Sequence, residues 1–259
     1  MLKRLWMRRD NSGRNTGQTG RAARTLAMNL GLNLIALGVC AAHARTAEEQ
    51  YPAMAPLEQY LMANRADEID QARSAAPPSI SSDADVLTLG RHGYETAIKG
   101  KNGFVCLVQR AWFSGLTDQE FWNPKERAPI CFNPQGARSV LPTFLRRTGW
   151  VLAGASKDKI IARTKAEIAA NEISVPEIGA MSYMLAKNAY HSDAVAGPWH
   201  PHLMFFLPHM NVVDWGANLS GSPVLGSDGG IEPFTIFFVP VARWSDGTPD
   251  SKPLGVHNM

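Results

Sequence analysis

Residues 85–110 read DVLTLGRHGYETAIKGKNGFVCLVQR, and this stretch decides the fold class. Its apolar and β-branched residues fall into three short runs, which predict strands at Asp85–Leu89, Tyr94–Lys99 and Phe104–Arg110. The Asn-Gly pair at 102–103 is typical of the tight turn of a β-hairpin. We therefore expect a β-sheet to begin here, with the second and third strands forming a hairpin.

The middle of the chain has helical patterning. Pro134 to Leu152 predicts a helix that Pro142 either kinks or divides into two pieces. Ser156 to Asn171 predicts a second helix, since serine is a favoured N-cap, and Pro176 to Lys187 predicts a third. The helices come as a block instead of alternating with strands, which disfavours a doubly wound parallel fold.

The last third of the chain returns to strands and loops. His200–Leu207 and Phe234–Val241 are short, Phe-rich apolar runs that predict central strands. Between them, Asn211–Gly230 is rich in Gly, Ser, Pro and Asp and has no periodicity, and a loop of this length is often functional. We expect one α+β domain over residues 85–259, with an antiparallel or mixed sheet flanked by helices.

A helical arm is expected ahead of this domain. Pro56–Arg73 places Leu57, Tyr60, Leu61 and Asn64 on one helical face, and its acidic and basic residues are interspersed on a solvated outer face. The Pro-Pro pair at 77–78 ends that helix, and a short linker follows. Residues 45–84 are therefore predicted to be a helical arm and linker.

The N-terminus has the pattern of an export signal. Basic residues extend to Arg24, an apolar stretch covers residues 26–40, and an Ala-x-Ala site ends at Ala44. A membrane anchor and a lipid anchor on Cys40 are the alternatives, although a membrane span needs about twenty apolar residues. We expect residues 1–44 to be a cleaved signal peptide, the mature chain to be periplasmic or secreted, and no transmembrane segment to remain.

The charge balance argues against nucleic acid as a partner. The chain has 26 Lys and Arg against 23 Asp and Glu, but residues 1–44 hold seven of the basic residues and one acid. The remaining chain therefore has 19 basic and 22 acidic residues. Binding to phosphate backbones needs a clustered excess of cations, which the remaining chain lacks. The expected partner is a small molecule or a component of the cell envelope.

Two of the three cysteines would remain after cleavage, namely Cys106 and Cys131. An even number of cysteines in an oxidising compartment predicts a disulfide bond. The alternatives are a redox pair or a thiolate metal site, but the sequence has no CxxC motif and no histidine near either cysteine.

Histidines gather late in the chain, and two of them, His200 and His202, would lie on one face of a strand. Two imidazoles on one face can bind zinc or another divalent transition metal, and a catalytic zinc adds a third protein ligand and a bound water. The candidates for the third ligand are His191, His209, Asp193 and Asp214. A polar pocket without metal and purely structural histidines are the alternatives.

Two short motifs resemble those of enzyme families. Arg91-His92-Gly93 resembles the motif of the histidine phosphatases, which implies a phosphorylated His92; the alternative is a strand with a bend at Gly93. Trp199-His-Pro-His202 resembles the zinc-binding end of the cell-wall peptidases that cut D-amino-acid bonds, but the His-x6-Asp pair of that family is absent. The sequence also lacks HExxH, GxSxG, a P-loop and GxGxxG.

Tryptophans lie mostly in predicted loops, where they either line a binding cleft or anchor the loop. The candidate binding residues are Trp199, Asp214, Trp215 and His92.

Four stretches resemble a group of exported bacterial proteins. They are Gly90–Glu95 (GRHGYE), Asn102–Cys106 (NGFVC), Ala180–Met184 (AMSYM) and Trp199–Phe205 (WHPHLMF). The resemblance implies that His92, His200 and His202 belong to one structural unit, and it implies no activity.

Three functions follow as expectations. The first is a metal-dependent hydrolase of the cell envelope that uses His200 and His202. The second is a non-catalytic periplasmic protein that binds a ligand or partner through its Trp-lined loops. The third is a histidine-phosphatase-like enzyme that uses His92.

Overall fold

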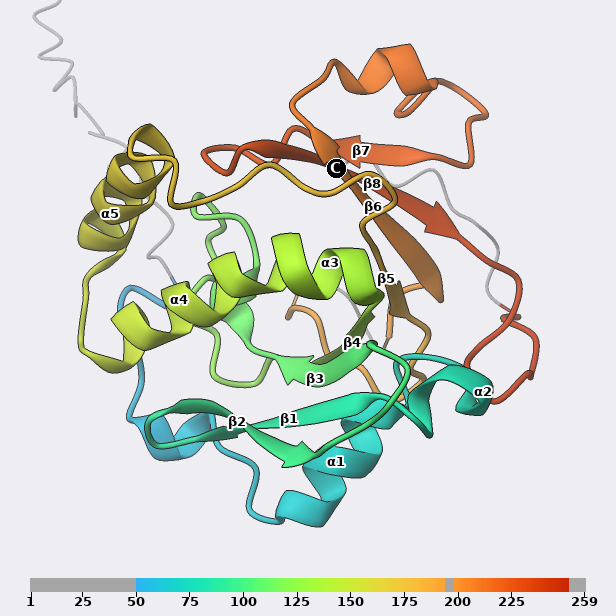
Figure 1. Cartoon of the computed structure of the whole chain (residues 1–259), viewed down its shortest axis with the longest axis horizontal. Coiled ribbons are helices and arrows are strands. Elements are labelled where there is room, and N and C mark those ends of the chain that lie inside the picture. Colours follow the sequence, from blue (N-terminus) through green and yellow to red (C-terminus); the bar gives the residue numbers. More distant parts are fainter. Residues whose placement is uncertain (1–49, 194–197, 252–259) are drawn as a thin grey trace, which may run out of the picture. The chain divides into compact units, whose positions relative to one another are not determined.

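The computed structural model describes residues 50–193 and 198–251, which form a single α+β domain (Figure 1). The predicted signal peptide, its cleavage site and Cys40 lie outside the described residues. None of the helices in the described residues combines the length and the apolar character that crossing a bilayer requires.

The core of the domain is one mixed sheet in the order β2-β1-β3-β4-β5-β6-β8-β7. β1 and β3 are parallel, and every other pair of neighbouring strands is antiparallel, which confirms the predicted mixed sheet. The strands are β1 (Asp85–Gly90), β2 (Gly93–Ile98), β3 (Val105–Gln109), β4 (Ala128–Phe132), β5 (Met181–Met184), β6 (His202–Pro208), β7 (Leu225–Ser227) and β8 (Phe234–Pro240).

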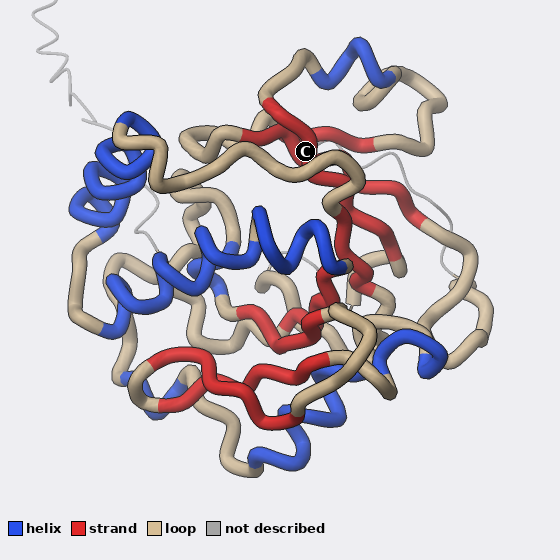
Figure 2. The backbone as a smooth tube through the Cα atoms, in the orientation of Figure 1, coloured by secondary structure: helices blue, strands red, loops and turns tan. Residues whose placement is uncertain are grey.

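Helices cover both faces of the sheet (Figure 2). The α-helices are α1 (Arg65–Arg73), α2 (Pro78–Ser81), α3 (Pro134–Ser139), α4 (Leu141–Leu152) and α5 (Lys157–Ala169). Single 3-10 turns are η1 (Leu57–Gln59), η2 (Ala111–Phe113) and η3 (Val212–Trp215). Pro142 does divide the predicted 134–152 helix in two, and Ser156 does cap α5.

The period-two alternation of the strands separates two apolar clusters. Val86 of β1 packs with Cys106 of β3 and Ala72 of α1 on one face. Leu87 of β1 points the other way and joins the larger cluster, which includes Phe144 of α4. The sheet is therefore buried on both faces, between α1 and the α3–α4 pair.

The predicted hairpin at the Asn-Gly pair is wrong. β2 pairs with β1, and the hairpin turns at Arg91-His92. The segment after β2 is fastened to the start of β1 instead, because the amide of Gly100 donates to Asp85 (2.7 Å) and that of Lys101 to the carbonyl of Asp83 (2.8 Å). A side chain at Gly100 would come within 2.2 Å of that carbonyl oxygen. This anchoring places β3 parallel to β1.

Two helix predictions also need correction. The predicted 176–187 helix contains β5, whose residues pair with both β4 and β6. The predicted 56–73 helix begins only at Arg65, where the side chain of Asn64 accepts the amide hydrogen of Ala66 at 2.9 Å. The first part of that stretch holds the short turn η1.

The arm is built into the domain through a buried ion pair. Arg110, which follows β3, donates to Glu68 of α1 at 2.8 Å, and the two side chains are 0% and 3% exposed. The same guanidinium donates to the carbonyls of Tyr60 (2.7 Å) and Val108 (2.5 Å). Glu68 also accepts the amide hydrogen of Leu89 in β1. Glu68 of α1 is thus hydrogen-bonded to β1 and ion-paired with the residue that follows β3.

Cys106 and Cys131 form a disulfide bond between directly opposed positions of β3 and β4, as predicted. The bond closes a loop with a sequence separation of 25 residues. We expect its reduction to lower the free energy of unfolding by about 3–4 kcal/mol, because the unfolded chain then gains loop entropy. Urea unfolding with and without reductant measures this difference, and the double variant C106A/C131A is the control. Equal unfolding midpoints would contradict the expectation.

Candidate functional site

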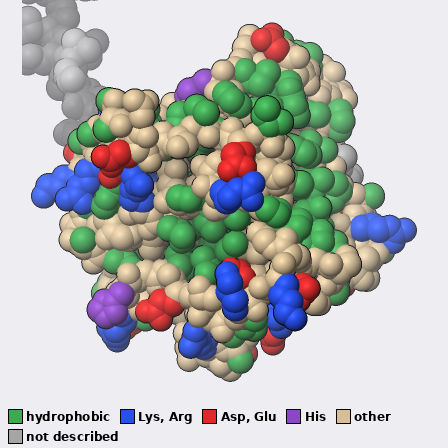
Figure 3. All heavy atoms as spheres, viewed as in Figure 1, with side chains coloured by type: hydrophobic (Ala, Val, Ile, Leu, Met, Phe, Trp, Pro, Cys, Tyr) green, Lys and Arg blue, Asp and Glu red, His purple; other side chains and the backbone are tan. Residues whose placement is uncertain are grey.

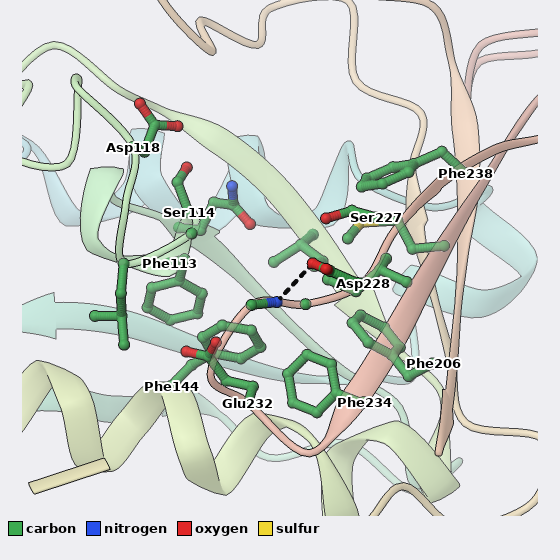
Figure 4. Close-up of a pocket in the computed structure, with 18 of the residues that line it drawn as sticks. Phe113, Ser114, Asp118, Phe144, Phe206, Ser227, Asp228, Glu232, Phe234 and Phe238 are labelled. Carbon is green, nitrogen blue, oxygen red and sulfur yellow. Dashed lines mark hydrogen bonds between the residues drawn. The ribbon is translucent and has the colours of Figure 1, made fainter. Parts of the chain in front are cut away.

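A cavity of about 560 Å³ lies between the sheet and α4. Strands β4, β5, β6 and β8 form one wall, α4 forms the opposite wall, and the loops after η2 and β7 complete it (Figure 4). Aromatic side chains dominate the lining: Phe113, Phe144, Trp199, Phe206, Phe234 and Phe238. Phe113 and Phe144 stack with ring centres 4.9 Å apart.

Strand alternation explains why these side chains meet. In β6, His202, Met204 and Phe206 are separated by two residues and face the cavity. In β8, Phe234, Ile236 and Phe238 do the same. β6 and β8 are paired, so the two rows lie side by side and form a continuous wall.

A glycine-rich loop closes one side of the cavity. Asp228 points into the space between the loop and the sheet, and its carboxylate accepts the amide hydrogen of Gly230 at 3.0 Å (Figure 4). Gly229 has φ +72°, and a side chain there would lie 1.9 Å from the carbonyl oxygen of Phe234. Only glycine therefore allows this loop to approach β8 so closely.

Arg147 of α4 and Glu232 form a buried ion pair at the cavity wall, with side chains 1% and 4% exposed. Another nitrogen of Arg147 donates to the carbonyls of Trp112 (2.9 Å) and Ser114 (3.0 Å). Burial lowers the pKa of Arg147 to about 9, so the guanidinium stays charged at neutral pH. The pair thus holds the η2 loop in place and leaves the cavity without an unpaired cation among the described residues that line it.

His202 is a deeply buried polar side chain of the cavity wall. Its Nδ1 lies 2.7 Å from the carbonyl oxygen of His200, and its ring is 4.6 Å from that of Trp199. Burial, together with the neighbouring His191 and His200, lowers the pKa of His202 to about 3. Burial also lowers the pKa of His191 to about 4. Both imidazoles are therefore neutral at physiological pH.

His200 lies apart from the cavity. β6 begins at His202, so the prediction that both histidines lie within one strand is wrong. Pro201 precedes the strand and has no amide hydrogen for a ladder bond, which agrees with this boundary. Nδ1 of His200 bonds to Asp250 at 2.6 Å, and both side chains are buried. His200 is thus a structural partner of Asp250.

The other predicted ligands are dispersed. His209 is exposed beyond the far end of β6, about 20 Å of strand from His202. Asp193 accepts hydrogen bonds from Tyr51 and Tyr190 and pairs with Lys125. Asp214 is exposed on η3 and does not line the cavity.

The described residues do not fit the zinc site expected from the sequence. None of their His, Cys, Asp and Glu side chains form a group of three or more that could hold a metal ion. His191 and His202 bring two imidazoles together, with ring centres 6.4 Å apart, whereas a catalytic zinc takes three protein ligands.

The remaining binding candidates lie at different places. Trp199 lines the cavity, as predicted for a loop tryptophan. Trp215 instead packs on the opposite face of the sheet, where its ring stacks on Phe237 at 4.3 Å. Together with Val213 and Leu219 it leaves an exposed apolar surface, seen at the top of Figure 3. His92 is exposed in the β1–β2 turn, and the adjacent Arg91 pairs with Glu58.

Several cavity residues were not predicted from the sequence. They are Phe113, Ser114 and Asp118 after β3, Phe144 and Arg147 on α4, and Glu232 before β8. The amphipathic pattern of α4 indicated only that one face of the helix is buried. Arg147 lies on that face, and a charged residue at a buried position was the one sign of a polar site there.

Comparison with protein-family models, curated proteins and solved structures finds no match to this chain. The cavity itself is therefore the basis for any functional argument.

Proposed function

We propose that this chain is an exported, non-catalytic protein that binds a small, largely apolar molecule in the cavity between the sheet and α4. The observation that carries the proposal is the cavity's size and lining. A volume of about 560 Å³ falls within the range of ligand pockets, and aromatic walls with a few polar groups are typical of such sites.

The state of the two histidines favours binding over catalysis. A general acid or base works best when its pKa lies near the operating pH. The pKa values of His191 and His202, about 4 and about 3, leave both rings as weak bases and as permanent hydrogen-bond acceptors. Such groups orient a ligand without exchanging protons with it.

The cell envelope is the proposed location. The N-terminal pattern of residues 1–44 supports export, and the Cys106–Cys131 disulfide suits an oxidising compartment. An extracytoplasmic small-molecule carrier or sensor domain combines both features.

Filling the cavity should weaken binding. Ile236 of β8 lines the cavity and is half-buried, so Ile236→Trp places an indole in the space that a ligand would occupy. The probe is N-phenyl-1-naphthylamine, whose fluorescence rises in apolar surroundings. We expect the native chain to bind it and the variant to bind at least about tenfold more weakly, which corresponds to the loss of a modest part of the apolar contact area.

Val239→Trp is the matched control. Val239 lies on the same strand but on the opposite face, and its partner in β6 is Leu203. We expect this variant to keep the native affinity, with circular dichroism verifying that both variants are folded. A native chain that does not raise the probe's fluorescence, or equal loss in the two variants, would count against the cavity as the binding site.

The two enzymatic hypotheses stay predictions. The zinc content of the purified mature chain tests the metal-dependent hydrolase, and phosphatase activity compared with that of His92→Ala tests the phosphatase. Among the described residues, no three or more His, Cys, Asp and Glu side chains are grouped so that they could hold a metal ion, and Arg91, next to His92, pairs with Glu58.

A further inference from the structure

We infer that the ligand of this cavity carries a hydrogen-bond donor on an aromatic body, and that the donor binds Nε2 of His202. The inference rests on the proposed function and narrows it to a class of ligand. Phenols, aromatic amines and ring N–H groups belong to this class.

The first step is the tautomer of His202. A carbonyl oxygen only accepts hydrogen bonds, so the Nδ1 that lies 2.7 Å from the carbonyl of His200 must carry the hydrogen. The ring is neutral, so Nε2 has a free lone pair. His202 is only 3% exposed and lines the cavity, and among the described residues no donor reaches this nitrogen. A donor on a ligand would give this acceptor a hydrogen bond that no described residue supplies.

The second step is the excess of acceptors around the cavity. Asp118 and Asp228 contribute exposed carboxylates at its rim. Arg147 is the Lys or Arg side chain among the described lining residues. Its charge is matched by Glu232, and its Nη1 donates to two carbonyls, whereas its Nε has no hydrogen-bond partner. A ligand carboxylate would therefore face the like charges of Asp118 and Asp228, whereas a hydroxyl or an amine would find acceptors.

The third step concerns the body that carries the donor. The rings of His202, Trp199 and Phe238 are in mutual contact, with ring centres 4.6 Å (Trp199–His202), 6.0 Å (His202–Phe238) and 6.3 Å (Trp199–Phe238) apart. A ligand that reaches His202 therefore meets aromatic rings in the cavity lining, and such rings favour another flat ring. We expect the donor to be attached directly to that ring, because the ring and the donor then reach the aromatic rings and Nε2 together.

The test compares ligands that share one ring system. 1-Naphthol, 1-methoxynaphthalene and 1-naphthoate each compete with N-phenyl-1-naphthylamine for the native chain. We expect 1-naphthol to displace the probe at a concentration about tenfold lower than its methyl ether, which has no donor, and 1-naphthoate to be the weakest competitor.

His202→Phe removes the acceptor and keeps an aromatic ring. We expect the preference for 1-naphthol over the ether to shrink to within about twofold in this variant. His209→Phe, which changes an exposed histidine at the other end of β6, should keep the native preference.

The failures of the two proposals are distinguishable. If the native chain binds the probe but 1-naphthol and its ether compete equally, the donor inference is wrong and the cavity function stands. The inference is also wrong if His202→Phe keeps the preference. If the native chain binds neither the probe nor any naphthalene, both proposals fail. The comparison on the native chain does not depend on the folding of any variant.

Discussion

Glu68→Ala should lower the free energy of unfolding by about 3–5 kcal/mol, one of the two largest effects that we expect from a single substitution. Glu68 and Arg110 are 3% and 0% exposed, so removing the carboxylate leaves a guanidinium charge buried without its counterion. The substitution also removes the acceptor for the amide of Leu89. Urea unfolding followed by circular dichroism measures the loss.

Glu58→Ala is the matched control, because Glu58 pairs with Arg91 at 2.9 Å on the surface, where both side chains are more than half exposed. Exposed pairs are screened by water, so this variant should keep the native unfolding midpoint. A Glu68→Ala variant as stable as Glu58→Ala would show that the arm is not held by the buried pair.

Glu232→Ala is expected to have a similarly large effect, about 3–5 kcal/mol. The substitution leaves Arg147 buried beside the cavity without its counterion. Arg147 also positions the η2 loop through the carbonyls of Trp112 and Ser114, so the variant should bind N-phenyl-1-naphthylamine more weakly as well as unfold more easily. Urea unfolding and a fluorescence titration measure the two effects.

Two further variants sharpen this prediction. Replacing both partners with apolar residues of similar volume (R147M/E232L) should recover much of the stability, because no uncompensated charge remains. Glu177→Ala, which breaks the exposed pair with Arg138, should leave the unfolding midpoint unchanged. If R147M/E232L is less stable than Glu232→Ala, the loss in the single variant does not come from a stranded charge.

Much of the sheet could be predicted because several of its strands have a clear pattern of apolar residues in their own sequence. β1, β6 and β8 are apolar runs whose pattern is legible over six or seven residues. β5 has only four residues, and its apolar pattern is equally compatible with a buried helix. Its strand conformation is decided by pairing with β4 and β6. Long segments of chain separate β5 from both partners, so the pairing cannot be read from the local sequence. The parallel pairing of β3 with β1 is non-local in the same way.

The candidate site was only partly predictable. A cluster of histidines and a loop tryptophan pointed to the right strand, and His202, His191 and Trp199 do meet at the cavity. The role of His200 was predicted wrongly, because its bond to Asp250 joins residues fifty positions apart in sequence. The wall formed by α4 depends on how that helix packs over the sheet, which no local pattern specifies.

The order of the strands also bears on how copies of this protein behave when they are concentrated. The described sheet is open, with β2 and β7 as its outer strands, and unpaired backbone groups on such strands can recruit another chain. β7 is only three residues long. β2 presents the exposed side chain of Glu95 and is followed by the exposed Lys99. The short length of β7 and the charged side chains at β2 both disfavour pairing of these edge strands with another copy of the chain, and so disfavour aggregation.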